Sequence, residues 1–142
     1  MAEITLTSDV TWSGEGVRST ANIRDKQVVI DEPQALGGTD QGPNPVELLL
    51  SCLGGCLNVV ITSFAEKFGV QIDHLHIHVE GDIDPDGFTG KNPQVRPGVL
   101  GIRYHIDIES PSPSDKVQAL LQHVEKVCPI KDTLSGVPVR VV

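Results

Sequence analysis

The sequence predicts an α+β fold in which a long helix packs against curved antiparallel sheet. Three observations support this: short alternating strand-like segments open the chain, one long apolar segment with helix signals follows, and two alternating segments precede an amphipathic helix. Runs of strands separated by helices are typical of the α+β class. The 142 residues suit one domain over residues 1–142.

Composition and charge exclude several function classes. The chain is 39% hydrophobic and 21% charged with a net charge of −8, and it has neither a basic run nor an aromatic platform. Such a chain repels phosphate backbones and anionic lipid, so we expect no nucleic-acid and no membrane partner. Polar residues interrupt the apolar stretch 46–64, and no signal peptide is visible at the start, so we expect a cytoplasmic protein.

The N-terminal third is predicted to form a strand meander. Residues 2–12, 17–23 and 28–30 are rich in β-branched residues and alternate, with polar turns between them. Consecutive short strands joined by tight turns form antiparallel hairpins. Residues 31–44, with several Gly and Pro, are expected to form a long loop of functional interest.

The long apolar segment carries clear helix signals. Asn44 suits the cap, Pro45 the first helical position, and Glu47 lies three residues after the cap. The helix should continue to residue 68, stop at Gly69 and be largely buried, since it is apolar on nearly every side. The pair Gly54-Gly55 costs about 1 kcal/mol per glycine, which suggests close approach of another element.

The C-terminal half is predicted as strand, strand, helix and strand. Residues 72–83 and 99–108 alternate as antiparallel neighbours around a loop over 84–98. An amphipathic helix is expected over 112–127 with Ser112 as its cap, then one turn over 130–134 and a last strand over 137–142. The predicted order is β-β-β-α-β-β-α-β.

The three cysteines are the main candidates for chemistry. An odd count in a reducing compartment favours free thiols over a disulfide framework. Cys56 and Cys128 form one candidate redox pair, although a core Cys56 and a boundary Cys128 without chemistry are the simpler interpretation. A reacting thiol must be a thiolate, which a cation such as Arg18 or Arg24 would favour. Cys52, four residues before Cys56, is expected to be a core residue.

Other polar residues admit two interpretations. His74, His76 and His78 share one strand face, which suits either a metal site or a solvent-facing surface, and we expect neither metal nor cofactor. Glu47 either orients a substrate or cation, or simply caps the helix, because its nine-residue spacing from Cys56 places it half a turn away.

Two motifs in the right order resemble the OsmC/Ohr family. The first motif extends from the loop into the helix and the second follows the last helix, and together they comprise Asp31-Glu32-Pro33, Leu36-Gly37-Gly38, Gly42 to Leu50, Leu53 to Cys56, and Cys128 to Leu134.

The resemblance implies a fold, a reaction and partners. It implies an intertwined homodimer whose antiparallel sheets wrap long central helices. It implies an antioxidant stress-response enzyme that reduces organic hydroperoxides, with hydrogen peroxide as a further substrate. Cys56 would be the peroxidatic thiol, Cys128 the resolving thiol and Arg18 the thiolate partner, with Arg24 second. The reductant would be a dithiol or a lipoylated protein.

The chain departs from the family's hydroperoxide reductases at one position. Those proteins carry glutamate directly after the Asn-Pro, whereas this chain has Val46 there and Glu47 one residue later, as in the OsmC-like branch. The departure leaves a second hypothesis, a non-catalytic dimer that binds a small apolar ligand or senses redox state.

Overall fold

A computed structural model describes residues 2–136 and 140, which form two compact units, Met1–Leu49 and Leu50–Val142. The single domain expected from the sequence stays a prediction. The α+β class is confirmed, because small antiparallel sheets and helices both occur.

The first unit contains the predicted meander. Strands β1 (Asp9–Trp12), β2 (Ser19–Ile23) and β3 (Lys26–Ile30) form one antiparallel sheet in the order β1-β2-β3. The expected strand over residues 2–12 is wrong before residue 9. The β1 ladder runs from Asp9 opposite Asn22 to Trp12 opposite Ser19, and residues 2–8 take no part in it.

The loop after β3 is a compact structure built around close backbone contacts. It contains a short 3-10 helix, η1 (Gln34–Leu36). A Cβ atom on Gly38 would lie 1.8 Å from the carbonyl oxygen of Glu32, and one on Gly42 would lie 2.3 Å from that of Val29. Only glycine fits at these two positions, so the glycines of this loop serve packing as well as turning.

Helix α1 (Pro45–Phe64) begins and ends with the predicted signals. The Glu47 N–H donates to Asn44 Oδ1 at 2.8 Å and the Asn44 N–H donates to Glu47 Oε1 at 3.2 Å, which is a capping box. The regular helix stops at Phe64, earlier than the expected residue 68. A Schellman motif follows, in which Gly69 has φ 68° and the Val70 N–H donates to the Ala65 carbonyl at 2.8 Å.

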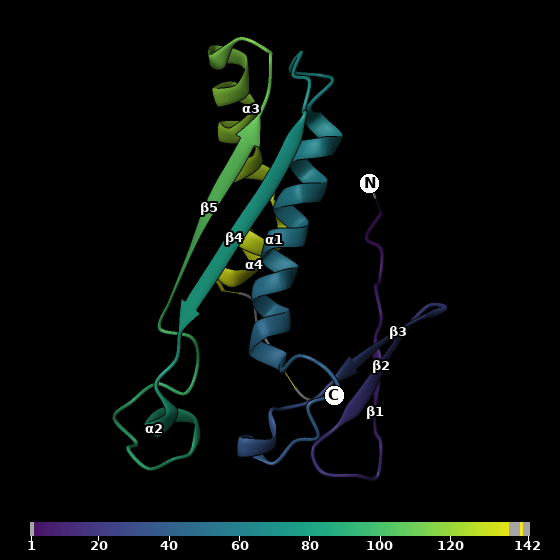
Figure 1. The fold of residues 1–142 in the computed structure, drawn as a ribbon, viewed down its shortest axis with the longest axis vertical. Helices are drawn as coiled ribbons and strands as arrows, with labels where there is room; N and C mark the ends of the chain where they lie inside the picture. Colours follow the sequence, from purple (N-terminus) through teal and green to yellow (C-terminus); the bar gives the residue numbers. More distant parts are fainter. Residues whose placement is uncertain (1, 137–139, 141–142) are drawn as a thin grey trace. The chain divides into compact units, whose positions relative to one another are not determined.

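The second unit packs two helices on one hairpin. Strands β4 (His74–Asp82) and β5 (Gly101–Glu109) pair antiparallel, with Ile77 opposite Ile106. Figure 1 shows α1 and α3 (Ser114–Val127) on one face of this hairpin, and the inward side chains of both strands pack against the buried core. The buried core consists of Leu53, Leu57, Val60, Ile61, Ala65, Val70, Leu120, Val124 and Cys128.

The expectation that α1 is largely buried is wrong for the chain alone. Only Leu53, Leu57, Val60 and Ile61 are buried within its twenty residues, and Val59 is 58% exposed. By length and composition alone this helix could cross a membrane, as core helices of soluble proteins also could, so the expectation of no membrane partner stays a prediction. A Cβ on Gly54 would lie 3.3 Å from Val79 Cγ2, whereas one on Gly55 would meet nothing within 4 Å, so close approach is confirmed for Gly54 only.

The connecting segments differ in detail from the predictions. The loop between the hairpin strands contains a helical turn, α2 (Pro85–Phe88). The expected cap Ser112 is wrong: Pro113 is the cap of α3, and Ser112 Oγ instead accepts a hydrogen bond from the Gln71 N–H at 2.8 Å. The expected turn over 130–134 is helix α4 (Pro129–Leu134), and the expected last strand falls on residues 137–142, which lie outside the described residues except Arg140.

Candidate active site

The fold brings together two of the sequence-predicted site residues, Cys56 and Cys128. The Cys128 thiol donates to Cys56 Sγ at 3.1 Å, across a separation of 72 residues in the chain. Cys128 is 2% exposed and Cys56 is half-buried. The simpler interpretation, in which Cys128 lies at the boundary of the protein, is therefore wrong about its position, since the thiol is part of the core.

Local sequence sets the position of Cys128. Proline disfavours helical backbone at the residue before it, so α3 must end at Cys128. Cys128 has extended backbone (φ −69°, ψ 111°), and it is both the C-cap of α3 and the N-cap of α4. This break turns the chain so that both sulfur atoms meet at the end of α3.

The environment of Cys56 opposes ionisation in the single chain. Burial raises the pKa of the Cys56 thiol, the neighbouring Cys128 raises it further, and a hydrogen bond from the Ile130 backbone partly offsets both effects. A thiol with a raised pKa is mostly protonated at neutral pH. A cation close to Cys56 would favour its thiolate and oppose this shift.

The pair has the geometry for reversible disulfide chemistry. A disulfide bond is about 2.05 Å long, so the two sulfur atoms need to approach by about 1 Å. Both thiols are free, and they come from separate elements whose side chains point toward each other. The two thiols can therefore lose two electrons and form a disulfide bond with only a small movement of the core.

The third cysteine lies elsewhere. Cys52 is exposed on α1, contrary to the expectation that it is a core residue. The buried stripe of the helix runs through Leu53 and Leu57, and Cys52 lies on the other side of it. Helix phase explains the difference: an apolar segment does not reveal which side faces the core.

Arg18 belongs to an ordered network in the first unit. Its guanidinium donates to Thr39 Oγ1 and to Glu15 Oε2, both at 3.0 Å. The Thr39 hydroxyl in turn donates to Asp31 Oδ2 at 2.6 Å. That bond, with backbone donors from Glu32, Gln41 and Thr39, lowers the pKa of Asp31 to about 2, although burial opposes the shift. The network orients Arg18, while its contact with Cys56 stays a prediction.

The remaining predicted residues have structural positions. Arg24 lies at the tip of the β2–β3 hairpin with a positive φ of 57°. Glu47 forms the capping box described above, which matches its simpler interpretation, and its role toward substrate stays a prediction.

The histidine face of the hairpin points to solvent. His74, His76 and His78 are exposed, and His78 lies opposite His105 in the register. Within the described residues, no group of three or more His, Cys, Asp or Glu side chains could hold a metal ion.

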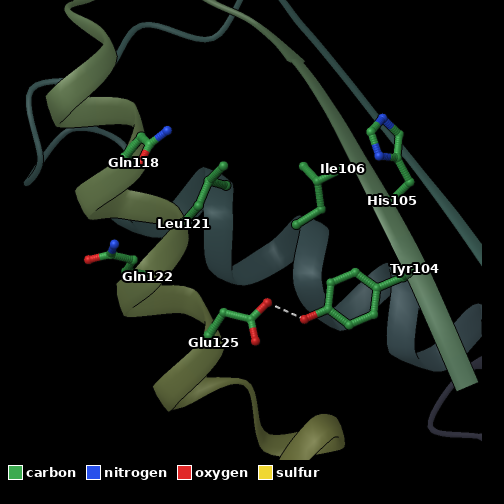
Figure 2. Close-up of a pocket in the computed structure, with 7 residues that line it drawn as sticks. All are labelled: Tyr104, His105, Ile106, Gln118, Leu121, Gln122 and Glu125. Carbon is green, nitrogen blue, oxygen red and sulfur yellow. Dashed lines mark hydrogen bonds between the residues drawn. The ribbon is translucent and has the colours of Figure 1, made fainter.

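Sequence reasoning missed a polar cluster beside Cys128. The Tyr104 hydroxyl of β5 donates to Glu125 Oε1 of α3, and Lys131 Nζ of α4 donates to Glu125 Oε2. Figure 2 shows Tyr104 and Glu125 pointing toward each other at one end of a cavity of about 310 Å³. The available signal was the spacing, because Glu125 and Lys131 lie three residues before and after Cys128.

Comparison with known proteins identifies the family. The model of the OsmC-like protein family matches residues 38–142, whereas among curated proteins none matches the chain. An OsmC-like protein from Mycoplasma pneumoniae has a similar structure, with a TM-score of 0.80, 24% identity, and 96% of this chain and 91% of that chain covered.

Two further structures share the fold at lower identity. An organic hydroperoxide resistance protein from Legionella pneumophila has a TM-score of 0.67 at 19% identity, covering 96% of this chain and 93% of that chain. One from Elizabethkingia anophelis has a TM-score of 0.65 at 16% identity, covering 95% and 91%. The chain belongs to the OsmC-like protein family.

Proposed function

We propose that this protein is a thiol-dependent peroxidase that reduces organic hydroperoxides, and hydrogen peroxide as a further substrate. The observation that supports the proposal is the 3.1 Å contact between the Sγ atoms of Cys56 and Cys128. Similar structures from two bacteria are organic hydroperoxide resistance proteins, which favours this substrate class.

The reaction has two steps in the protein. The Cys56 thiolate attacks one peroxide oxygen; the S–O bond forms, the O–O bond breaks, and the leaving alkoxide takes a proton to become an alcohol. The Cys128 sulfur then attacks the Cys56 sulfenic acid; the S–S bond forms, the S–O bond breaks, and hydroxide leaves with the Cys128 proton as water. An external dithiol or a lipoylated protein reduces the disulfide by thiol exchange.

A positive charge near Cys56 would favour its thiolate, because burial raises the pKa of its thiol. Arg18 is the proposed partner and Arg24 the second choice. The Thr39 and Glu15 contacts hold the Arg18 side chain in one orientation, which lowers the entropy cost of presenting it to a thiolate. Glu47 completes the proposed set as a residue that orients the arginine or the substrate.

The test is intact mass and free-thiol count before and after one equivalent of cumene hydroperoxide. Wild type should lose the Cys56 and Cys128 thiols within seconds, Cys128→Ser should gain one oxygen at Cys56, and Cys52→Ser should behave as wild type. Thiols that persist for hours, or peroxide consumption that survives Cys56→Ser, would contradict the mechanism.

The proposed assembly is a homodimer. The α1 face that carries Cys52, Gly55 and Val59 is exposed, and an exposed apolar helix face of this length is typical of an association surface. Burying Val59 against a second copy predicts that Val59→Glu yields monomers in sedimentation velocity, whereas Lys67→Glu at the exposed end of the same segment does not.

A second candidate is a non-catalytic dimer that binds a small apolar ligand or senses redox state. Two observations favour it: the raised pKa of the Cys56 thiol, and Val46 at the position where the family's hydroperoxide reductases carry glutamate. Native mass spectrometry decides between the two. A co-purified ligand together with thiols that do not respond to peroxide supports binding, and loss of two protons on peroxide addition supports the enzyme.

A further inference from the structure

We propose that Tyr104, Glu125 and Lys131 form a brace that positions Cys128 for attack on the oxidised Cys56. The inference rests on the proposed peroxidase function for its role in turnover. It assigns these three as positioning residues for the second, disulfide-forming step.

The brace connects the two helices on either side of the break at Cys128. Glu125 belongs to the last turn of α3 and Lys131 to α4, so their ion pair connects the two helices across the break at Cys128-Pro129. The Tyr104 hydroxyl fixes the other carboxylate oxygen to β5, and Lys131 Nζ lies 5.8 Å from the centre of the Tyr104 ring. Three elements therefore meet at one carboxylate.

The core alone fixes α4 weakly. None of the six residues of α4 is buried, and Ile130 is only partly buried against the core. Orientation of α4 governs two contacts at Cys56: the Cys128 thiol at 3.1 Å and the hydrogen bond from the Ile130 backbone. A polar contact that holds α4 against α3 consequently controls the geometry of both.

Electrostatics keep the brace intact at neutral pH. Lys131 and the Tyr104 hydroxyl both lower the pKa of Glu125, and Glu125 raises the pKa of Lys131. Burial and the Glu125 contact raise the pKa of Tyr104, so its hydroxyl remains a donor. All three groups keep the protonation states that their contacts require.

The second reaction step is the one that depends on this geometry. Oxidation of Cys56 depends on its thiolate and on peroxide access and does not require Cys128 to move, whereas disulfide formation needs the Cys128 sulfur to advance by about 1 Å along a defined line. Misplacement of a reacting group on this scale reduces rates strongly. Without the brace, Cys56 sulfenic acid should persist longer and oxidise further to sulfinic acid.

The experiment measures Cys56 oxidation and disulfide closure separately. All variants are made in the full-length protein that carries Cys52→Ser. Stopped-flow with one equivalent of cumene hydroperoxide measures sulfenic acid formation and its decay to disulfide. Diamide provides a peroxide-free measure, because it forms an adduct on one thiol that the other thiol then displaces, giving the same Cys56–Cys128 disulfide.

Glu125→Gln and Lys131→Met should slow disulfide closure about tenfold in both assays and slow sulfenic acid formation less, because that step depends on α4 only through the Ile130 hydrogen bond to Cys56. The double charge swap Glu125→Lys with Lys131→Glu should restore closure in part, because it restores the ion pair but removes the carboxylate that accepts from Tyr104; a purely packing role would predict no recovery. Lys126→Met, an exposed lysine on the last turn of α3, is the matched control and should close at the wild-type rate.

The possible outcomes are distinct. Closure at the wild-type rate in both single variants, or no recovery in the charge swap, overturns the brace. If the Cys52→Ser protein does not react with peroxide, but its disulfide closure with diamide is slowed by Glu125→Gln and Lys131→Met, the peroxidase proposal is overturned and the brace is supported. If the Cys52→Ser protein forms no disulfide with diamide, the brace itself is overturned.

Discussion

Leu57→Ala tests how much the buried face of α1, next to Cys56, contributes to the stability of the second unit. Leu57 is 0% exposed and belongs to the core with Leu120 and Val124 of α3. It directly follows Cys56, so its packing fixes the helix phase that presents the thiol.

The expected loss follows from the removed apolar groups. The change deletes roughly three carbon groups at about 0.8 kcal/mol each, or about 2.4 kcal/mol of transfer free energy. The cavity left behind adds to this, because a close-packed site relaxes only in part. The free energy of unfolding should therefore fall by about 3–4 kcal/mol.

The assay is urea unfolding followed by circular dichroism, in reductant and at one fixed protein concentration, since association would shift the midpoint. Leu36→Ala is the matched control: the same substitution at a residue that is 60% exposed should cost less than about 1 kcal/mol. Leu57→Ala with an equally small loss would refute the packing described here.

Three further predictions follow from individual residues. The charged Asp31 carboxylate, whose pKa is lowered from 3.8 to about 2, should contribute stability that is complete above the unfolded pKa and is lost as pH falls through about 2; Asp31→Asn should remove this part of the acid unfolding curve, and an unchanged curve would contradict it. In the monomeric Val59→Glu variant, where no second copy covers Gly55, Gly55→Ala should stabilise α1 by up to about 1 kcal/mol in thermal unfolding, and Gly54→Ala should gain less because its Cβ would lie 3.3 Å from Val79 Cγ2; the reverse ranking would be inconsistent with the packing. Iodoacetamide with peptide mapping should modify Cys56 at pH 7 in wild type, where the proposed Arg18 cation favours the thiolate, and only at higher pH in Arg18→Met, because burial raises the pKa of the Cys56 thiol; wild-type labelling that appears only at higher pH would contradict the proposed thiolate.

Local sequence determined most of the elements. The Asn44–Glu47 capping box, the left-handed Gly69 and the alternation of the β4–β5 hairpin depend on neighbouring residues, so short-range rules predicted them. The break at Cys128-Pro129 follows in the same way from the steric effect of proline on the preceding residue.

Tertiary structure decided which faces these elements bury. Cys52 and Cys56 occur in one apolar helix, and the sequence could not place Cys52 outside the core, because helix phase depends on the partners that pack against it. β1 likewise comprises only the residues that pair with β2, and the composition of residues 2–8 did not reveal that they lie outside the ladder.

The site shows the same division. The sequence named Cys56 and Cys128 as candidates, while only the fold brought their sulfur atoms to 3.1 Å and placed Tyr104, Glu125 and Lys131 around the break at Cys128. Residue type determines which chemistry a side chain can perform, and the sequence gives the residue type directly. Distances between residues 72 positions apart arise from the packing of α1, α3 and the hairpin, so no local pattern encodes them.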